Sequence, residues 1–152
     1  MCGILGAIGN FSNDSFIDSA KALHHRGPDF TGYLSVTSNI INHRDDKNAF
    51  LNQESNCAFA HTRLSIIDLK SESNQPFVKH NKVLTYNGEI YNYIELRKEL
   101  IELGYSFTTQ SDTEVLISAL DAWGESCLEK LNGMWSFCLY DHETKKLFIA
   151  RD

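Results

Sequence analysis

The stretch that decides the fold is MWSFCLYD, residues 134–141. Its apolar residues occupy both alternating sets of positions of an extended strand, so both faces of that strand must be covered. A second β-rich run, KLFIARD at 146–152, follows the polar connection HETKK, which is typical of an antiparallel hairpin. A strand that is buried on both faces implies layers, and we therefore predict two stacked sheets with helices packed outside them.

Amphipathic segments supply the predicted helices, because their apolar residues recur at the spacing of one helical face. The predicted helices cover residues 15–25, about 92–103 and 111–124, and a short helix holds Leu128 and Leu131. A glycine follows or ends each of the three longer segments, as a C-cap requires. Ser111 and Glu114 form a capping box at the start of the third helix.

Strand-like runs account for most of the remaining chain. These predicted strands cover residues 2–8, 31–43, 56–66 and 82–92. Residues 44–55 are polar, have turn composition and bury little, so we expect an exposed loop there. The combination predicts one α+β domain over residues 1–152.

Composition excludes several classes of protein. The formal net charge is -6, the pI is near 5.5, and no basic cluster exceeds Lys145-Lys146, which argues against nucleic-acid and membrane partners. Four cysteines without C-x-x-C spacing argue against a disulfide framework or a thiolate zinc site. The glycine-interrupted N-terminus resembles neither a signal peptide nor a membrane helix. We expect a reduced, cytoplasmic chain.

Cys2 follows the initiator methionine in the opening MCGILGAIGN. Removal of Met1 would place a thiol and a free α-amino group on one residue. An α-amino group has a reference pKa of about 7.7 to 8.0, so it can accept a proton from the thiol. The structural alternative is a small buried cysteine, and the residue by itself leaves both readings open.

Two arginines are further candidates. Arg26 lies in HHRGPD, residues 24–29, which suits a helix end and also suits a loop that contacts substrate. Arg63 lies in HTRLSIID, where a surface ion pair and a bidentate grip on a ligand carboxylate are both consistent with the sequence.

Residues 86–92, YNGEIYN, are the most ambiguous motif. Asn87-Gly88 between β-rich residues favours a type I′ hairpin turn. The alternative is a pair of hydrogen-bond donors that forms an oxyanion hole, with Glu89 as an adjacent anion. Asp112 suits the positive end of a helix, and its carboxylate could equally face a ligand ammonium.

Eight ordered motifs resemble the glutaminase domain of class II glutamine amidotransferases, specifically its asparagine synthetase branch. They are MCGI, HRGPD, HTRLSIID, QP, NGEIYN, SDTEV, WG and LNGMWSF. The resemblance covers essentially the whole chain, and HRGPD together with NGEIYN distinguishes this branch from the phosphosugar and purine branches. It implies an N-terminal nucleophile hydrolase, a four-layer αββα sandwich.

The resemblance also implies a mechanism. Cys2, freed of Met1, would attack the side-chain amide of glutamine, with its own α-amino group moving the proton. Asn87 and Gly88 would stabilise the oxyanion, ammonia would leave, and water would hydrolyse the thioester to glutamate. The implied glutamine-binding residues are Arg63 for the carboxylate, Glu89 and Asp112 for the ammonium, and Arg26 on a loop that closes over the site.

Relatives in this branch continue after ARD with further strands and then a synthetase domain that uses ATP and Mg to make asparagine from aspartate. The resemblance therefore implies that residues 1–152 are a C-terminally truncated glutaminase domain, with no cofactor of its own and a synthetase domain as partner. A homodimer stays open. One alternative is a non-catalytic domain that only binds glutamine or a partner chain. Another is a hydrolase of a different amide, against which Arg63, Glu89 and Asp112 argue because they suit a free amino acid.

Overall fold

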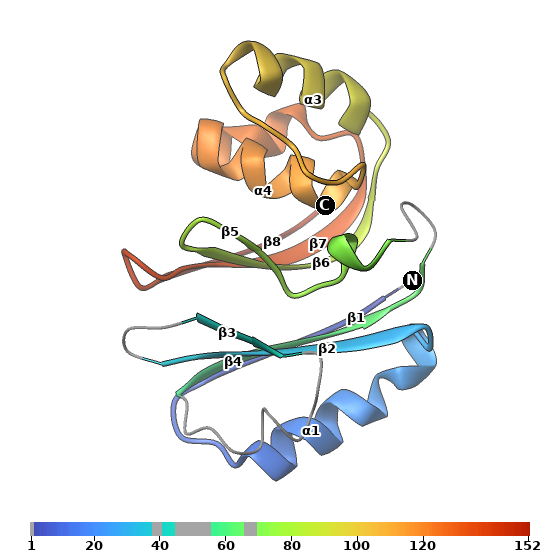
Figure 1. Cartoon of the computed structure of the whole chain (residues 1–152), viewed down its shortest axis with the longest axis vertical. Helices are drawn as coiled ribbons and strands as arrows, with labels where there is room; N and C mark the ends of the chain where they lie inside the picture. The colour runs from blue at the N-terminus through green and yellow to red at the C-terminus, as the bar shows by residue number, and fades with distance from the viewer. Residues whose placement is uncertain (1, 38–40, 45–55, 66–69) are drawn as a thin grey trace.

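The computed structural model describes residues 2–37, 41–44, 56–65 and 70–152, with the backbone alone described for 41–44. Two four-stranded antiparallel sheets stack face to face, with α1 outside one sheet and α3 and α4 outside the other (Figure 1). The first sheet has the order β1-β4-β2-β3 and the second the order β5-β6-β7-β8. The predicted four-layer αββα sandwich is confirmed.

The element bounds follow the sequence patterns closely. The helices are α1 (Asn13–Ala22), α3 (Tyr93–Glu102) and α4 (Asp112–Trp123), with 3₁₀ turns at His24–Arg26, Ser71–Ser73 and Gly124–Lys130. The strands are β1 (Gly3–Ile8), β2 (Phe30–Val36), β3 (Ile41–Arg44), β4 (Cys57–Arg63), β5 (Phe77–Lys79), β6 (Lys82–Ile90), β7 (Gly133–Asp141) and β8 (Lys146–Arg151). The predicted hairpin of residues 134–152 is confirmed as β7 and β8.

The single strand predicted for residues 31–43 is wrong. Residues 31–43 do not form a single strand, because β2 and β3 pair antiparallel with Val36 opposite Ile41. In the sequence, the polar run TSN at 37–39 separates the two apolar stretches. The predicted loop at 44–55 begins one residue early, since Arg44 belongs to β3, and residues 45–55 lie outside the described residues. The three-residue β5 was not predicted, because it is too short to show periodicity.

The hairpin reading of Asn87-Gly88 is also wrong. Both residues lie inside β6, where Asn87 pairs with Ser136 and Gly88 with Trp135. A Cβ added at Gly88 would lie 2.3 Å from the carbonyl oxygen of Met134, so the close approach of β7 requires glycine here. The long pairing with β7 outweighs the local turn preference.

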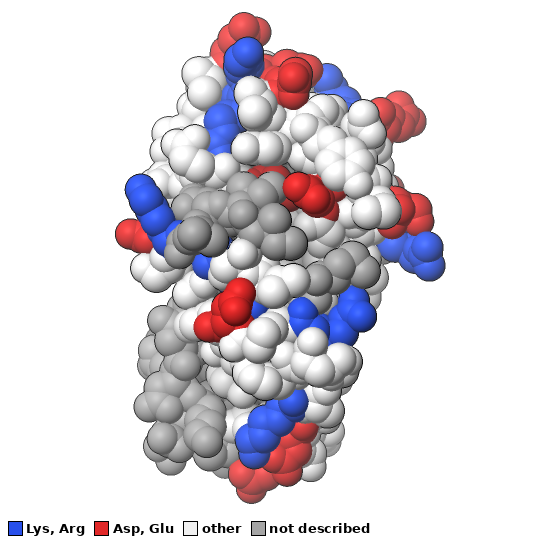
Figure 2. All heavy atoms as spheres, turned by 90° about the vertical axis from the view of Figure 1, so that its right-hand side faces the viewer, with Lys and Arg blue, Asp and Glu red and all other residues white. Residues whose placement is uncertain are grey.

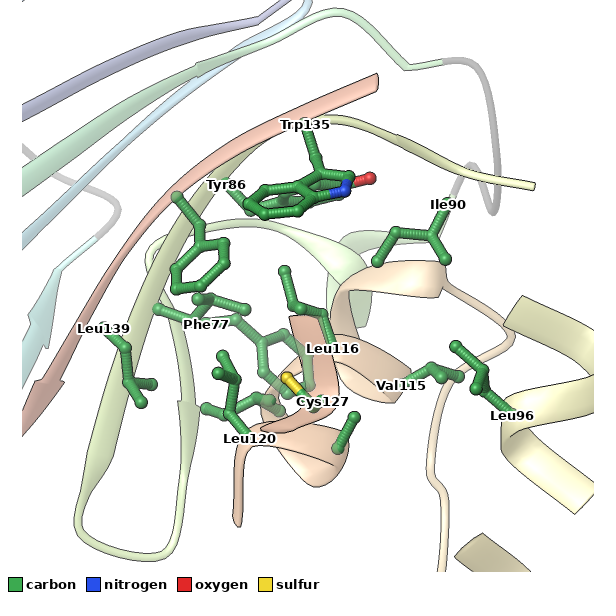
Figure 3. Packing of buried hydrophobic residues seen from close by; sticks show 14 of the residues in the cluster. Phe77, Tyr86, Ile90, Leu96, Val115, Leu116, Leu120, Cys127, Trp135 and Leu139 are labelled. Atoms are coloured by element: carbon green, nitrogen blue, oxygen red, sulfur yellow. The ribbon is translucent and has the colours of Figure 1, made fainter. Parts of the chain in front are cut away.

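The main core lies between the second sheet and its helices (Figure 3). It gathers side chains from β5, β6, β7, α3 and α4, among them Phe77, Tyr86, Leu96, Leu116 and Trp135. The first nine residues of α4, from Asp112 to Leu120, are all buried. This helix therefore has a fixed position on the sheet, and so do the polar groups at its N-terminus.

The two sheets each present an open edge, formed by β1 and β8. An apolar groove of about 560 Å³ lies between these strands. Among the described strands β8 pairs only with β7, and Ile149 on it is 67% exposed. No helix within the described ranges is long and apolar enough to cross a membrane.

Candidate active site

A pocket of about 130 Å³ forms where the N-terminus, the end of β4, the middle of β6 and the start of α4 meet. The residues that line it and were singled out from the sequence as catalytic or glutamine-binding are Cys2, Arg63, Asn87, Gly88, Glu89 and Asp112. Because they come from four separate parts of the chain, only the fold brings them together.

Cys2 immediately precedes β1, and its sulfur lies against the end of β4. The Sγ atom is 3.4 Å from the backbone nitrogen of Leu64, which donates to it, and 3.8 Å from the carbonyl oxygen of Leu64. The next backbone N–H, of Gly3, donates to Oγ1 of Thr62 at 3.1 Å. These contacts fix the half-buried thiol at one wall of the pocket.

The backbone of β6 directs Gly88 toward the pocket. In an antiparallel strand, every second residue points both its N–H and its C=O to the same side. The N–H of Tyr86 donates to Oε1 of Gln75 (2.7 Å), and that of Ile90 to Oδ2 of Asp112 (3.1 Å), both on the side away from β7. The N–H of Gly88, midway between them, faces this same side, and Gly88 is exposed. It can therefore donate to a ligand.

Arg63 is the last residue of β4 and is only 6% exposed. Its Nη1 donates to the carbonyl oxygen of Lys70 at 3.0 Å and to Oδ1 of Asn74. These bonds hold the guanidinium in the pocket wall, where its planar donors suit a carboxylate.

Arg26 does not line this pocket. It lies in the 3₁₀ turn after α1, and the motif that contains it braces the end of β4 instead. The backbone N–H of Asp29 donates to the carbonyl oxygen of Arg63 (3.0 Å), and the Asp29 carboxylate accepts from the N–H of Ser65 (2.7 Å). A Cβ at Gly27 would lie 2.3 Å from the carbonyl oxygen of Thr62. In this structure the loop supports the site rather than covering it.

Asp112 is the first residue of α4 and is 6% exposed. Burial raises the pKa of its carboxyl group, while donation from the Tyr86 hydroxyl (2.8 Å) and the backbone N–H of Ile90 (3.1 Å) opposes that rise. Glu89 lines the same pocket from β6. A buried carboxylate with a raised pKa gains stability from a nearby cation, so this wall suits an ammonium group.

His61 also lines the pocket and was not predicted to do so. Burial lowers its pKa to about 4, so the imidazole is neutral near pH 7. Its Nε2 lies 3.1 Å from the carbonyl oxygen of Tyr86, which assigns the proton to Nε2. Among the described residues, its Nδ1 and the Oδ1 of Asn87 have no hydrogen-bond partner. Both are hydrogen-bond acceptors.

Other lining residues were missed as site residues or assigned a different role. They are Leu64, Ser73, Gln75, Tyr86, Ser111, Thr113 and Met134. All of them except Ser73 lie in the motifs quoted above, and this membership was the only signal that the sequence offered for them. No group of three or more histidine, cysteine or acidic residues in the described part of the chain could hold a metal ion.

Charge is mixed on the face of the molecule that Figure 2 draws. Figure 2 shows the side of the molecule at which the N-terminus lies, and basic and acidic side chains alternate over it. Neither sign dominates this face, so the charges that matter for a small ligand are those buried in the pocket.

Known proteins that resemble the chain give a consistent result. A family model described as "Glutamine amidotransferase domain" matches residues 33–152. The glutamine-hydrolyzing asparagine synthetase of Sandersonia aurantiaca is 38% identical over 160 residues, which cover 100% of this chain and 26% of that protein. Asparagine synthetase 1 of Bacillus subtilis is 34% identical over 161 residues, covering 100% of this chain and 22% of that protein. The chain thus spans about a quarter of the length of these relatives.

The fold has a solved counterpart. Glutamine phosphoribosylpyrophosphate amidotransferase from B. subtilis superposes with a TM-score of 0.82 over 100% of this chain and 37% of that one, at 21% sequence identity. At this identity the likeness establishes the fold alone. Together with the family match over residues 33–152, it leads to one conclusion: the chain belongs to the glutamine amidotransferase domain family.

Proposed function

We propose that this domain hydrolyses glutamine to glutamate and ammonia, with Cys2 as the nucleophile after removal of Met1. The observation that carries the proposal is the convergence of the Cys2 thiol, the Gly88 N–H and the charged groups of Arg63, Glu89 and Asp112 on one pocket. Such a pocket offers a cationic group for the carboxylate of a free amino acid and anionic groups for its ammonium.

The proposed reaction proceeds in two steps. The sulfur of Cys2 attacks the carboxamide carbon, the α-amino group takes the thiol proton and passes it to the departing nitrogen, and ammonia leaves. Water then attacks the thioester carbonyl and releases glutamate. Asn87 and Gly88 donate to the oxyanion in both steps. The oxyanion pair lies on β6 beside β7, a rigid position that favours preorganised stabilisation.

Glutamine is bound through its charged ends in this proposal. Arg63 pairs with the α-carboxylate, and Glu89 and Asp112 pair with the α-ammonium. We assign Arg26 a supporting role through its loop, in place of the substrate contact that the resemblance implied. The step needs no cofactor in our proposal.

The relatives support a proposal for the ammonia acceptor. We propose that the ammonia is used to make asparagine from aspartate, with a synthetase domain as partner that uses ATP and Mg, since matched relatives are named glutamine-hydrolyzing asparagine synthetases. We also propose a cytoplasmic location, which the four free cysteines support.

The test is the intact mass of the purified chain before and after exposure to a diazo-ketone analogue of glutamine. We expect loss of Met1 and one covalent adduct that is absent in Cys2→Ala. Cys138→Ala is the matched control, because Cys138 is another free, half-buried thiol outside the pocket. This variant retains Cys2 and should still be labelled. An unlabelled chain that lacks Met1 would favour a domain that only binds.

A further inference from the structure

Tyr86 is held at three points by three different parts of the fold. Its backbone N–H donates to Oε1 of Gln75 at 2.7 Å, and its carbonyl oxygen lies 3.1 Å from Nε2 of His61 on the other sheet. Its hydroxyl donates to Oδ2 of Asp112, on α4, at 2.8 Å. The residue is 2% exposed and immediately precedes Asn87. It therefore connects the two ends of the pocket.

The hydroxyl acts on the orientation of Asp112. The bonds from Tyr86 and from the backbone of Ile90 both end on Oδ2. These two bonds fix the direction of the carboxylate group at the wall of the pocket. A ligand ammonium would meet a carboxylate whose direction is already fixed, so less ordering is required on binding.

The hydroxyl also acts on the charge of Asp112. Burial raises the pKa of this carboxyl, and the hydrogen bond from Tyr86 is the largest of the contributions that lower it; the backbone N–H groups of Ile90, Thr113 and Asp112 itself add to it. Glu89 and Cys2 are the other ionisable groups that interact electrostatically with the Tyr86 hydroxyl, and both raise its pKa. Arg97, behind the helix start, directs its guanidinium to the carbonyl oxygens of Thr109 and Ser111.

We propose that Tyr86 is a positioning residue, whose hydroxyl keeps the carboxylate of Asp112 aimed at the α-ammonium of glutamine. Its clamped backbone sets the adjacent oxyanion donors Asn87 and Gly88 at the other end of the substrate. The inference deepens the proposed function and rests on it.

The first variant is Tyr86→Phe, which keeps the ring and removes one oxygen. A hydrogen bond to a charged group that is lost in this way lowers affinity by roughly tenfold or more. We expect KM for glutamine to rise about tenfold at pH 7.5, while kcat stays within about twofold. We also expect the acid limb of kcat/KM to move to higher pH, because Asp112 without its donor is protonated more readily.

Tyr140→Phe is the matched control, because Tyr140 is also a buried tyrosine but lies outside the pocket. It should leave KM and the pH profile unchanged, whereas a general loss of packing would alter both variants alike.

Asp112→Glu serves as a second variant that retains the charge and displaces the carboxylate from the hydroxyl. It should raise KM with little change in kcat, and it tests the inference even if Tyr86→Phe fails to fold.

The outcomes separate the two proposals. Wild-type protein without Met1 that neither turns over glutamine nor is labelled by the diazo-ketone contradicts the proposed function, and the inference with it. Wild-type turnover combined with an unchanged KM and pH profile in Tyr86→Phe overturns the inference alone. An unchanged KM in Asp112→Glu overturns it as well.

Discussion

Asp112 and Glu114 lie two residues apart in the first turn of α4 and are both buried, at 6% and 1% exposure. Their pKa values nevertheless shift in opposite directions. For both, burial is the largest influence and acts to raise the pKa. Glu114 overcomes it through donation from the backbone of Thr109 and Thr108, from the Thr109 hydroxyl and from Lys79, so its pKa is lowered. The donors to Asp112 are all uncharged groups, and its pKa is raised.

The difference separates structure from function within one helical turn. Glu114 ties the 108–109 loop and Lys79 of β5 to the helix, with bonds of 2.7 to 3.1 Å. Asp112 faces a pocket and lacks a cationic partner among the described ion pairs. A fully satisfied carboxylate stabilises the fold, whereas one left partly satisfied retains affinity for a ligand cation.

The largest expected effect is on stability and comes from replacing Glu114, the carboxylate whose hydrogen bonds are satisfied. Glu114→Ala removes the acceptor of the Thr108 and Thr109 amides and the anionic partner of Lys79, and we expect the free energy of unfolding to fall by about 3 kcal/mol. Urea denaturation at pH 7 measures it. Glu102→Ala, on the exposed end of α3, is the control and should have little effect. A loss below about 1 kcal/mol for Glu114→Ala would mean that the network contributes little.

Asp112→Asn tests the other member of the pair. We expect glutamine KM to rise about ten- to a hundredfold, because the amide carries no charge for the ammonium. Stability should change by less than about 1 kcal/mol, since a buried carboxylate with a raised pKa is a net cost near neutral pH. Steady-state kinetics and urea denaturation of the same sample check both parts. A variant that binds glutamine normally would contradict the ammonium role.

Ser111→Ala acts on both carboxylates through the helix start that they share. The Ser111 hydroxyl accepts from the backbone N–H of Glu114 at 3.3 Å, and loss of such an N-cap costs about 1 kcal/mol. Thermal denaturation should show the loss. Ser111→Asp, which restores a capping acceptor, should recover most of it. Recovery by aspartate distinguishes a capping role from simple loss of side-chain volume.

The smallest effect is a difference in pH dependence. Because the folded pKa of Glu114 is lowered, its stabilisation is present above its unfolded pKa, near 4.5, and is lost as pH falls through the folded value. Because that of Asp112 is raised, its contribution is fully present below 3.8 and is lost as pH rises through the folded value. Urea denaturation of Glu114→Gln and Asp112→Asn at a series of pH values between 3 and 7 should show that each substitution removes its own one of these opposite pH dependences. Parallel curves for both variants would contradict the contrast.

The sequence predicted the layers and most elements because their periodicity is strong and their caps are local. Ser111 illustrates this, since its cap on Glu114 is a contact three residues long. The capping box itself is only half formed, because the Glu114 carboxylate binds Thr108 and Thr109 instead of returning to the Ser111 N–H. A pattern within one turn could not anticipate that loop.

The site was predictable to the extent that its residues lie in recognisable motifs. Asn87 and Gly88 were named, but their local pattern equally favoured a turn, and only pairing with β7 decides between the two. His61 and Gln75 lie in the motifs HTRLSIID and QP, but the motifs did not reveal their roles, because these roles depend on meeting the backbone of Tyr86 from distant segments. Arg26 was expected to cover the pocket, and its position depends on packing against β4.

The alternation along β6 has a consequence for how such a sequence can change. The N–H of Gly88 faces the pocket only because it is two residues from Tyr86 and two from Ile90. A substitution elsewhere in the strand leaves that parity intact. Insertion or deletion of one residue between Asn81 and Gly88 would exchange inward and outward groups and turn the donor into the sheet. Divergence in this region is therefore restricted to replacement, while changes in length must be accommodated in the connections beyond the strand ends.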